Sequence, residues 1–203
     1  LNKMYGAATQ LSLKDFVGFL HPRQRLNPTL DTYDIPSIFG RYGIIMPRRV
    51  FNRGTIYNHY QHFLRISDLD LALDIMDEQY PEYTATSETV LAKPDFYMCN
   101  TFIMRREDFL AWTKFQFDIL FEFTRRMGFD SKEKIDEHMK EHISEFGIYR
   151  ISKEPNHFNS ASYLGAIVGH LSERLLNIWV HHHFKDEFIL EVPLIEGEYL
   201  NNW

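Results

Sequence analysis

The stretch YMCNTFIMRREDFLAWTKFQFDILFEFTRRMG, residues 97–128, decides the class of fold. Its first part, Tyr97–Met104, is short and apolar, as is typical of a strand buried in a sheet. Its second part, Glu107–Met127, repeats apolar residues at helical spacing, and Gly128 follows as a residue that commonly ends a helix. A strand that leads into a long amphipathic helix predicts an α/β protein.

Short apolar runs and helical periods alternate along the rest of the chain. The further predicted strands are Phe16–Leu20, Tyr42–Met46 and Phe188–Leu194. The further predicted helices are Lys3–Leu13, Ile56–Leu64, a helix from the N-cap Ser67 to Gln79, one opened by Pro81, one over 131–142 and Ser162–Val180. Residues 21–41 contain three prolines and are expected to form a loop. We expect a single domain over residues 1–203.

Composition limits the classes of partner. The chain carries a formal net charge of −6, and its aromatic content of 15% argues against disorder. A nucleic-acid partner is not expected, because no basic block is present. Arginines come instead in close pairs, which suit either a local anionic ligand or a solvated surface: Arg23 with Arg25, Arg48 with Arg49, Arg105 with Arg106 and Arg125 with Arg126.

The cysteine content and the apolar runs bear on disulfide formation and on membrane insertion. Cys99 is the one cysteine, so no disulfide can form within the chain, and its apolar neighbours indicate a buried, inert thiol. No uncharged run approaches the ~20 residues that span a bilayer. These features fit a protein of a reducing compartment.

The ends of the predicted strands are the places where a ligand is expected. In open α/β sheets, ligands bind beyond the carboxyl ends of the strands, here after Leu20, Met46 and Met104. The segment that follows Leu20 is His21-Pro22-Arg23-Gln24-Arg25. Its two guanidinium groups and its imidazole could bind a diphosphate. The alternative is that these arginines pair with nearby acidic side chains.

Several motifs, in order, resemble a known family. They are Thr55-Ile56-Tyr57, Ser67-Asp68-Leu69-Asp70, Gln79-Tyr80-Pro81-Glu82-Tyr83, Asn100-Thr101-Phe102-Ile103-Met104, Phe117-Asp118-Ile119-Leu120-Phe121-Glu122 and Glu173-Arg174-Leu175-Leu176-Asn177-Ile178-Trp179. This pattern is similar to the glycosyltransferase family of bacterial capsule and O-antigen synthesis, long catalogued only as a domain of unknown function. The resemblance extends over nearly the whole chain.

The resemblance implies both a fold and an activity. It implies a GT-A-like, Rossmann-type sheet flanked by helices, which binds a nucleotide sugar. The expected activity is transfer of a sugar from a UDP-sugar donor to a lipid-linked or oligosaccharide acceptor of a bacterial surface polysaccharide. One branch of the family implies galactofuranose and inversion. The expected location is the cytoplasm, or the inner face of the cytoplasmic membrane beside other polysaccharide-assembly enzymes.

The resemblance also assigns site residues. Glu173 matches the family's Glu-Arg-Leu-Leu and is the candidate base that takes the proton of the acceptor hydroxyl. Asn100 and Thr101, placed at a strand end before the long helix, and Arg174 are the candidates for binding the acceptor or sugar. Two alternatives stay open: Glu173 and Arg174 form a structural ion pair at the helix surface, and Thr101 only packs in its strand.

The donor site departs from the common pattern. Many GT-A enzymes use Asp-x-Asp to hold a metal on the diphosphate, and the corresponding place here is His21-Pro22-Arg23, with no carboxylate. The fixed charges of Arg23 and Arg25 could stabilise the diphosphate instead. No protein ligand to a metal and no cofactor beside the donor are therefore expected, although metal dependence stays open. The family's His-Tyr-Arg-Arg-Tyr is altered at 22, 24 and 25, and its N-terminal strands are not seen in this chain.

Two other functions remain as alternatives. The first is a non-catalytic glycan-binding or assembly subunit that keeps the fold without a full donor site. The second is a zinc hydrolase, because His138-Met139-Lys140-Glu141-His142 places two histidines on one helical face. A third tract, His181-His182-His183, is expected to be an exposed helix end rather than a metal site.

Overall fold

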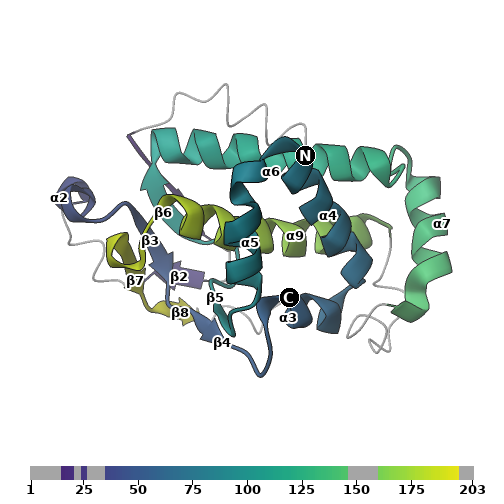
Figure 1. The fold of residues 1–203 in the computed structure, drawn as a ribbon, viewed down its shortest axis with the longest axis horizontal. Helices are drawn as coiled ribbons and strands as arrows, with labels where there is room; N and C mark the ends of the chain where they lie inside the picture. Colours follow the sequence, from purple (N-terminus) through teal and green to yellow (C-terminus); the bar gives the residue numbers. More distant parts are fainter. Residues whose placement is uncertain (1–14, 21–23, 27–34, 146–159, 197–203) are drawn as a thin grey trace.

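Four strands form the central sheet, in the order β1-β6-β3-β7. The computed structural model describes residues 15–20, 24–26, 35–145 and 160–196 (Figure 1). The strands are β1 (Phe16–Phe19), β3 (Ile44–Pro47), β6 (Phe102–Arg105) and β7 (Ile189–Val192). β6 runs antiparallel to both β1 and β3, whereas β3 and β7 are parallel. The predicted α/β class, a sheet flanked by helices, is confirmed, and the sheet is mostly antiparallel.

Two further sheets of two strands each are separate from the central one. β2 (Gln24–Leu26) pairs with β8 (Leu194–Glu196), and β4 (Val50–Phe51) pairs with β5 (Asp95–Phe96).

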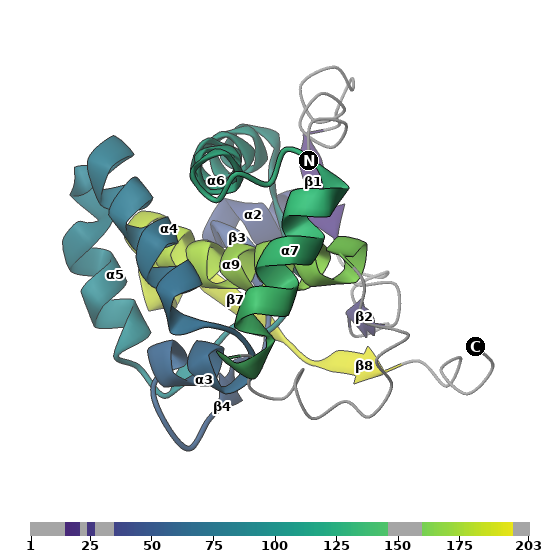
Figure 2. The same cartoon turned by 90° about the vertical axis from the view of Figure 1, so that its right-hand side faces the viewer.

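Most of the helices lie around one long central helix, α9. They are α2 (Ile35–Arg41), α3 (Ile56–Phe63), α4 (Ile66–Gln79), α5 (Thr84–Leu91), α6 (Arg106–Arg126), α7 (Lys132–His142) and α9 (Ser160–His183), with short 3-10 turns η2 (Pro81–Tyr83), η3 (Ile143–Glu145) and η4 (Asp186–Phe188). Both views place α9 in the middle of the helices, with α6 along one side (Figures 1 and 2). Residues 174–180 are buried without interruption, so this part of α9 is enclosed on all faces.

The core joins α6 to α9 through aromatic side chains. Trp112 of α6 and Trp179 of α9 are both buried, with ring centroids 6.0 Å apart. Phe115 and Phe123 are buried on the same helix as Trp112. The buried aromatic residues of α6 are therefore mainly core packing, as the helical spacing of its apolar residues indicates. Within the described residues, no helix has the length and apolar character to cross a membrane.

Most predicted helices are confirmed. α6 spans nearly the predicted residues, and Gly128 follows it in the left-handed conformation with φ 67°. The Oγ of Ser131 accepts from the Lys134 N–H at 3.3 Å at the start of α7. The cap of α4 was misplaced, because that helix begins at Ile66 and its N-cap Arg65 makes no side-chain capping bond. The predicted helix Lys3–Leu13 lies outside the described residues.

Two segments differ from prediction. Residues 21–41 were expected to be a loop, yet they contain β2 and α2. Pro36 is the second residue of α2. A backbone N–H at this position would have no acceptor within the helix, so proline is tolerated there. The Phe16–Leu20 run forms a strand but is not buried. Because β1 is an edge strand, Phe19 and Leu20 are 42% and 46% exposed.

Strand direction determines which residues meet at the end of the sheet. Phe19 at the end of β1 pairs with Phe102 at the start of β6. The carboxyl ends of β1, β3 and β7 therefore lie at the same edge of the sheet as the segment that precedes β6. This segment contains Asn100 and Thr101. The residues after Met104 were expected at this edge, but antiparallel β6 carries them to the opposite one.

Candidate functional site

The loop between β5 and β6, residues 97–101, is held by side chains of α9. Asn177 Nδ2 donates to the Tyr97 carbonyl at 2.9 Å, and Asn177 Oδ1 accepts from the Tyr97 N–H at 2.8 Å. The N–H of Cys99 donates to the carboxylate of Glu173. Cys99 has φ 64°, in the left-handed region that residues with a side chain rarely adopt. The predicted strand Tyr97–Met104 therefore begins only at Phe102, because a left-handed residue interrupts extended backbone.

Glu173 and Arg174 form an ion pair inside the protein. Arg174 Nη1 lies 2.8 Å from Glu173 Oε2, and the Arg174 side chain is 0% exposed. Its guanidinium carbon lies 5.4 Å from the ring centroids of both Tyr60 and Phe96. An ion pair at the helix surface was one expectation, and the surface location is wrong. Burial raises the pKa of Glu173, although the Arg174 charge and the Cys99 N–H oppose this shift.

Two histidines complete the surroundings of Arg174. His59 Nδ1 of α3 lies 2.6 Å from Arg174 Nη2, and His170 Nδ1 lies 3.3 Å from Nη1. Burial, together with the Arg174 charge, lowers the pKa of each histidine to about 4. Both imidazoles are therefore neutral near pH 7 and can accept hydrogen bonds from the guanidinium.

Sequence reasoning missed these histidines. The spacing of His170 and Arg174, four residues apart on one helix, was the available signal. Nothing in the local sequence of α3 pointed to His59. Cys99 was interpreted as an inert thiol, whereas its contribution to this site comes from its backbone.

Asn100 and Thr101 stand at the sheet edge beside this cluster. Thr101 is 0% exposed, and its Oγ1 has no hydrogen-bond partner among the described residues. Its full burial fits the packing alternative better than contact with a sugar. The buried Oδ1 of Asn100 also lacks a partner in the described part of the chain, but Asn100 lines a pocket. Of the two, Asn100 is the residue placed to meet a ligand.

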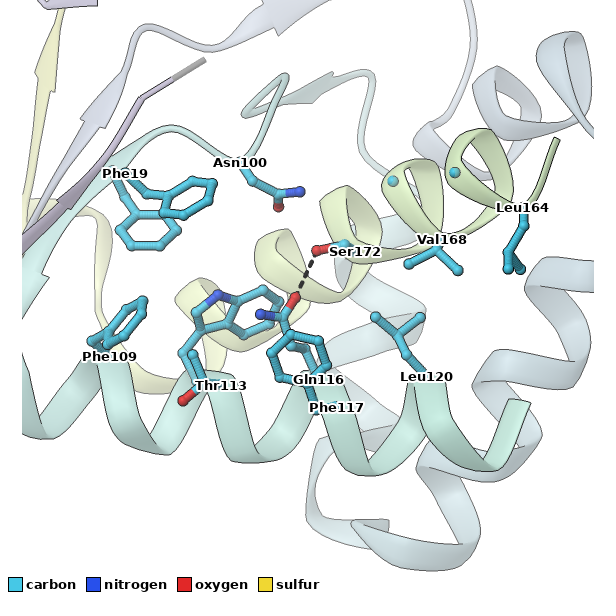
Figure 3. Close-up of a pocket in the computed structure, with 14 residues that line it drawn as sticks. Phe19, Asn100, Phe109, Thr113, Gln116, Phe117, Leu120, Leu164, Val168 and Ser172 are labelled. Carbon is cyan, nitrogen blue, oxygen red and sulfur yellow. Dashed lines mark hydrogen bonds between the residues drawn. The ribbon is translucent and has the colours of Figure 1, made fainter. Parts of the chain in front are cut away.

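The pocket lies between α6 and α9 and has a volume of about 540 Å³. Phe19 and Asn100 lie on the side away from α6, and α6 contributes Phe109, Phe117 and Leu120 (Figure 3). Its volume falls within the ~300–1,000 Å³ typical of small-molecule sites. Ser172, which also lines the pocket, directly precedes Glu173 in α9. The pocket and the polar cluster are therefore neighbours.

The predicted diphosphate site is only partly described. His21 and Arg23 lie outside the described residues. Arg25 is in β2, opposite Ile195 of β8. Arg49, which follows the end of β3, lies 2.7 Å from a Glu191 oxygen and 3.1 Å from an Asp95 oxygen.

The arginine pair at the end of α6 also has a protein partner. Arg125 and Arg126 both pair with Glu122. Together with Arg49, they pair with acids of the protein itself, whereas the same alternative for Arg23 and Arg25 stays untested.

The two histidine motifs have protein partners as well. His138 Nε2 lies 3.0 Å from Arg65 Nη1, and His142 Nδ1 lies 2.7 Å from Glu145 Oε1. A guanidinium beside His138 opposes a cation there. Within the described ranges, no group of three or more His, Cys, Asp or Glu side chains is arranged to hold a metal ion. His182 and His183 are exposed at the end of α9, as expected, whereas the His181 side chain is only 8% exposed.

Comparison with known proteins gives a family and a fold. Residues 9–154 match the family described as Domain of unknown function (DUF4422). This range includes Asn100–Met104 and ends before Glu173. A solved structure of the bifunctional glycosyltransferase WbbM in its apo form matches 97% of this chain, with a TM-score of 0.65 and 21% identity. The match covers 36% of the WbbM chain.

At this identity, the likeness to WbbM shows a shared fold. No curated protein matches the chain.

Proposed function

Because this chain belongs to the family described as Domain of unknown function (DUF4422) and shares its fold with a bifunctional glycosyltransferase, we propose that it is a glycosyltransferase domain. It transfers a sugar from a UDP-sugar to a lipid-linked or growing bacterial surface polysaccharide on the cytoplasmic side of the membrane. One observation carries the proposal: the Glu173 carboxylate is fixed by the Cys99 N–H beside Asn100, at the edge where β1, β3 and β7 end.

Glu173 is the proposed base. Its burial raises its pKa, which strengthens it as a proton acceptor while Arg174 keeps it ionised. In the proposed step, the acceptor hydroxyl oxygen forms a bond to the anomeric carbon, and the bond from that carbon to the diphosphate breaks. The hydroxyl proton passes to Glu173, and UDP leaves with the bonding electron pair. Attack from the face opposite the diphosphate inverts the anomeric centre.

Arg174 has a different role from the one its sequence position suggested. Its guanidinium is fully buried and contacts Glu173, His59 and His170. We therefore assign Arg174 as a positioning residue that acts on the sugar through Glu173. Asn100 is the proposed contact to a sugar hydroxyl, because its Oδ1 is free to accept a hydrogen bond within the described part of the protein.

The donor contacts rest on the resemblance. Arg23 and Arg25 are proposed to stabilise the leaving diphosphate by fixed positive charge, without a metal ion. Galactofuranose is the proposed sugar. Thermal denaturation with UDP tests the arginine assignment, since UDP should raise Tm without Mn²⁺ or Mg²⁺. Strict dependence of that shift on a divalent metal would contradict it.

The base is tested by Glu173→Gln. This variant should lose sugar transfer while UDP still raises its Tm, since the carboxylate acts on the acceptor and not on the nucleotide. Glu141→Gln on exposed α7 is the matched control and should transfer at the wild-type rate. Retained transfer by the Glu173 variant would remove Glu173 as the base.

The alternative is a non-catalytic glycan-binding subunit. The Glu173–Arg174 pair favours it, because the guanidinium already occupies one carboxylate oxygen at 2.8 Å. In that case glycans should bind equally well to wild type and Glu173→Gln, and no UDP should be released from any UDP-sugar.

A further inference from the structure

The pocket between α6 and α9 offers few polar partners to a ligand. Ser172 Oγ donates to Gln116 Oε1 at 2.7 Å, and Thr113 Oγ1 donates to the Leu110 carbonyl at 3.0 Å (Figure 3). Among the lining residues that the structure describes, Asn100 Oδ1 is the buried polar atom without a hydrogen-bond partner. A nucleobase or a sugar enclosed here would leave most of its polar groups unpaired, which opposes binding. The pocket suits an apolar group.

One wall of the pocket has no side chains at two positions. Gly165 and Gly169 of α9 line it, one helical turn apart, and a Cβ built at either position would meet no atom of the described residues within 4 Å. Glycine is a poor helix former, so two of them in the interior of a helix are unfavourable for α9 by itself. Their absent side chains leave backbone that a ligand can approach closely. Aromatic rings of α6 face the same space, with Phe109 and Phe117 among them.

The polar end of the pocket leads to the proposed reaction site. Asn100 follows Cys99, whose N–H donates to Glu173, and Ser172 precedes Glu173. A molecule with its apolar part in the pocket would therefore direct its polar head past Asn100 toward the reaction site. This arrangement requires an amphiphile with a hydrocarbon chain and a polar head.

Resting on the proposed glycosyltransferase function, we infer that this pocket holds the hydrocarbon chain of a lipid-linked acceptor. The sugar that receives the transfer then lies close to its lipid, so the substrate is an early acceptor that carries few sugars. The reaction that supplies such a substrate is transfer of a first sugar phosphate to a lipid phosphate. A long polysaccharide would place its growing end far from its own lipid and leave the pocket empty.

Calorimetric titration with three phosphates of different tails tests the inference. Farnesyl phosphate has a prenyl chain, dodecyl phosphate, used below its micelle concentration, has a linear chain, and methyl phosphate has none. We expect at least one of the two chain compounds to bind with a negative heat-capacity change, which marks burial of apolar surface, and methyl phosphate not to bind. Tighter binding of farnesyl phosphate identifies a prenyl lipid, and tighter binding of dodecyl phosphate identifies an acyl lipid. No binding by either chain, or equal binding of all three, overturns the inference.

Matched glycine variants locate the binding. Gly169→Leu fills the pocket and should weaken binding of the chain compound at least tenfold. Gly40→Leu makes the same change in α2, where a Cβ also meets nothing within 4 Å in the described part of the chain, and should bind as wild type. Gly165→Leu serves if Gly169→Leu fails to fold. Wild-type affinity in a folded pocket variant overturns the assignment.

Failure of the inference and failure of the proposed function can be told apart. Transfer from a UDP-sugar to a water-soluble acceptor sugar would be kept if the pocket assignment alone is wrong. If the wild-type protein does not catalyse that transfer, the proposed function itself is wrong.

Discussion

Asn177 bonds both backbone groups of Tyr97, donating from Nδ2 at 2.9 Å and accepting at Oδ1 at 2.8 Å. The side-chain amide of Asn177 thus supplies the two hydrogen bonds that a neighbouring strand would supply. Tyr97 directly follows β5, whose residues pair with β4. Four residues earlier on α9, Glu173 accepts from the Cys99 N–H. The helix therefore shapes the loop that carries Asn100, so the position of the candidate ligand contact depends on packing between α9 and the sheet.

Asn177→Ala should destabilise the protein and also impair the site. The two Tyr97 groups are buried, and leaving both unpaired should lower the free energy of unfolding by about 2–4 kcal/mol. Urea unfolding measures this loss. Asn58→Ala, an exposed change on α3, should leave the unfolding midpoint near that of wild type. An Asn177 variant as stable as wild type would show that the amide does not hold the loop.

Arg174→Met should be among the most damaging single substitutions. It leaves the Glu173 carboxylate buried without its cation, and breaking a buried pair in this way costs about 3–5 kcal/mol. The double variant Arg174→Met with Glu173→Gln should recover part of that loss, because no uncompensated charge remains. Unfolding free energies of the two single variants and the double variant give the coupling. Strictly additive losses would contradict the ion pair.

The helices were predictable because their signals are local. The apolar spacing of α6 and the glycine after it depend on residues within a few turns, and tertiary packing did not override them. The start of β6 was not predictable from the 97–104 run. The left-handed Cys99 is stabilised by side chains of α9, which lies far along the chain. The apolar pattern of residues 97–104 does not indicate such long-range hydrogen bonds.

The direction of β6 and the histidine partners of Arg174 could also not be predicted from the local sequence. A short apolar strand looks alike whether its neighbours are parallel or antiparallel, so Asn100 and Thr101 were assigned to the end of a strand that they in fact precede. Glu173 and Asn100 were found through the family resemblance. His59 becomes a partner of Arg174 only when α3 packs beside α9, which no spacing within α3 indicates.

Acid should weaken the protein between about pH 6.5 and pH 4. The pKa values of His59, His138 and His170 are each lowered to about 4, mainly by burial, from an unfolded value of 6.5. In this window the unfolded chain binds more protons at these positions than the native protein, so stability rises with pH and is lost as pH falls.

Asp68 opposes this trend. Burial raises its pKa from 3.8 to about 6, so the native carboxyl holds its proton more tightly and contributes stability that declines as pH rises through that range. Three histidines outweigh one carboxyl, and we expect Tm to fall by roughly 5 °C or more from pH 7 to pH 4.5. Calorimetry across this range measures the slope. His170→Gln should flatten it and exposed His62→Gln should not; a Tm that rises toward acid would contradict the assignment.

The same substitution should have opposite signs at two glycines. Gly165 lies within α9, and a Cβ there would meet no atom of the residues that the structure describes, so Gly165→Ala lowers the entropy of the unfolded chain without a clash. The free energy of unfolding should rise by about 0.4–1 kcal/mol. Gly128 has φ 67° at the end of α6, where a Cβ is unfavourable even though no atom of the described ranges would lie near it. Gly128→Ala should lower the free energy of unfolding by about 1–2 kcal/mol. Urea midpoints of both variants, measured together, test the pair, and changes of the same sign at both positions would show that backbone conformation does not govern the outcome.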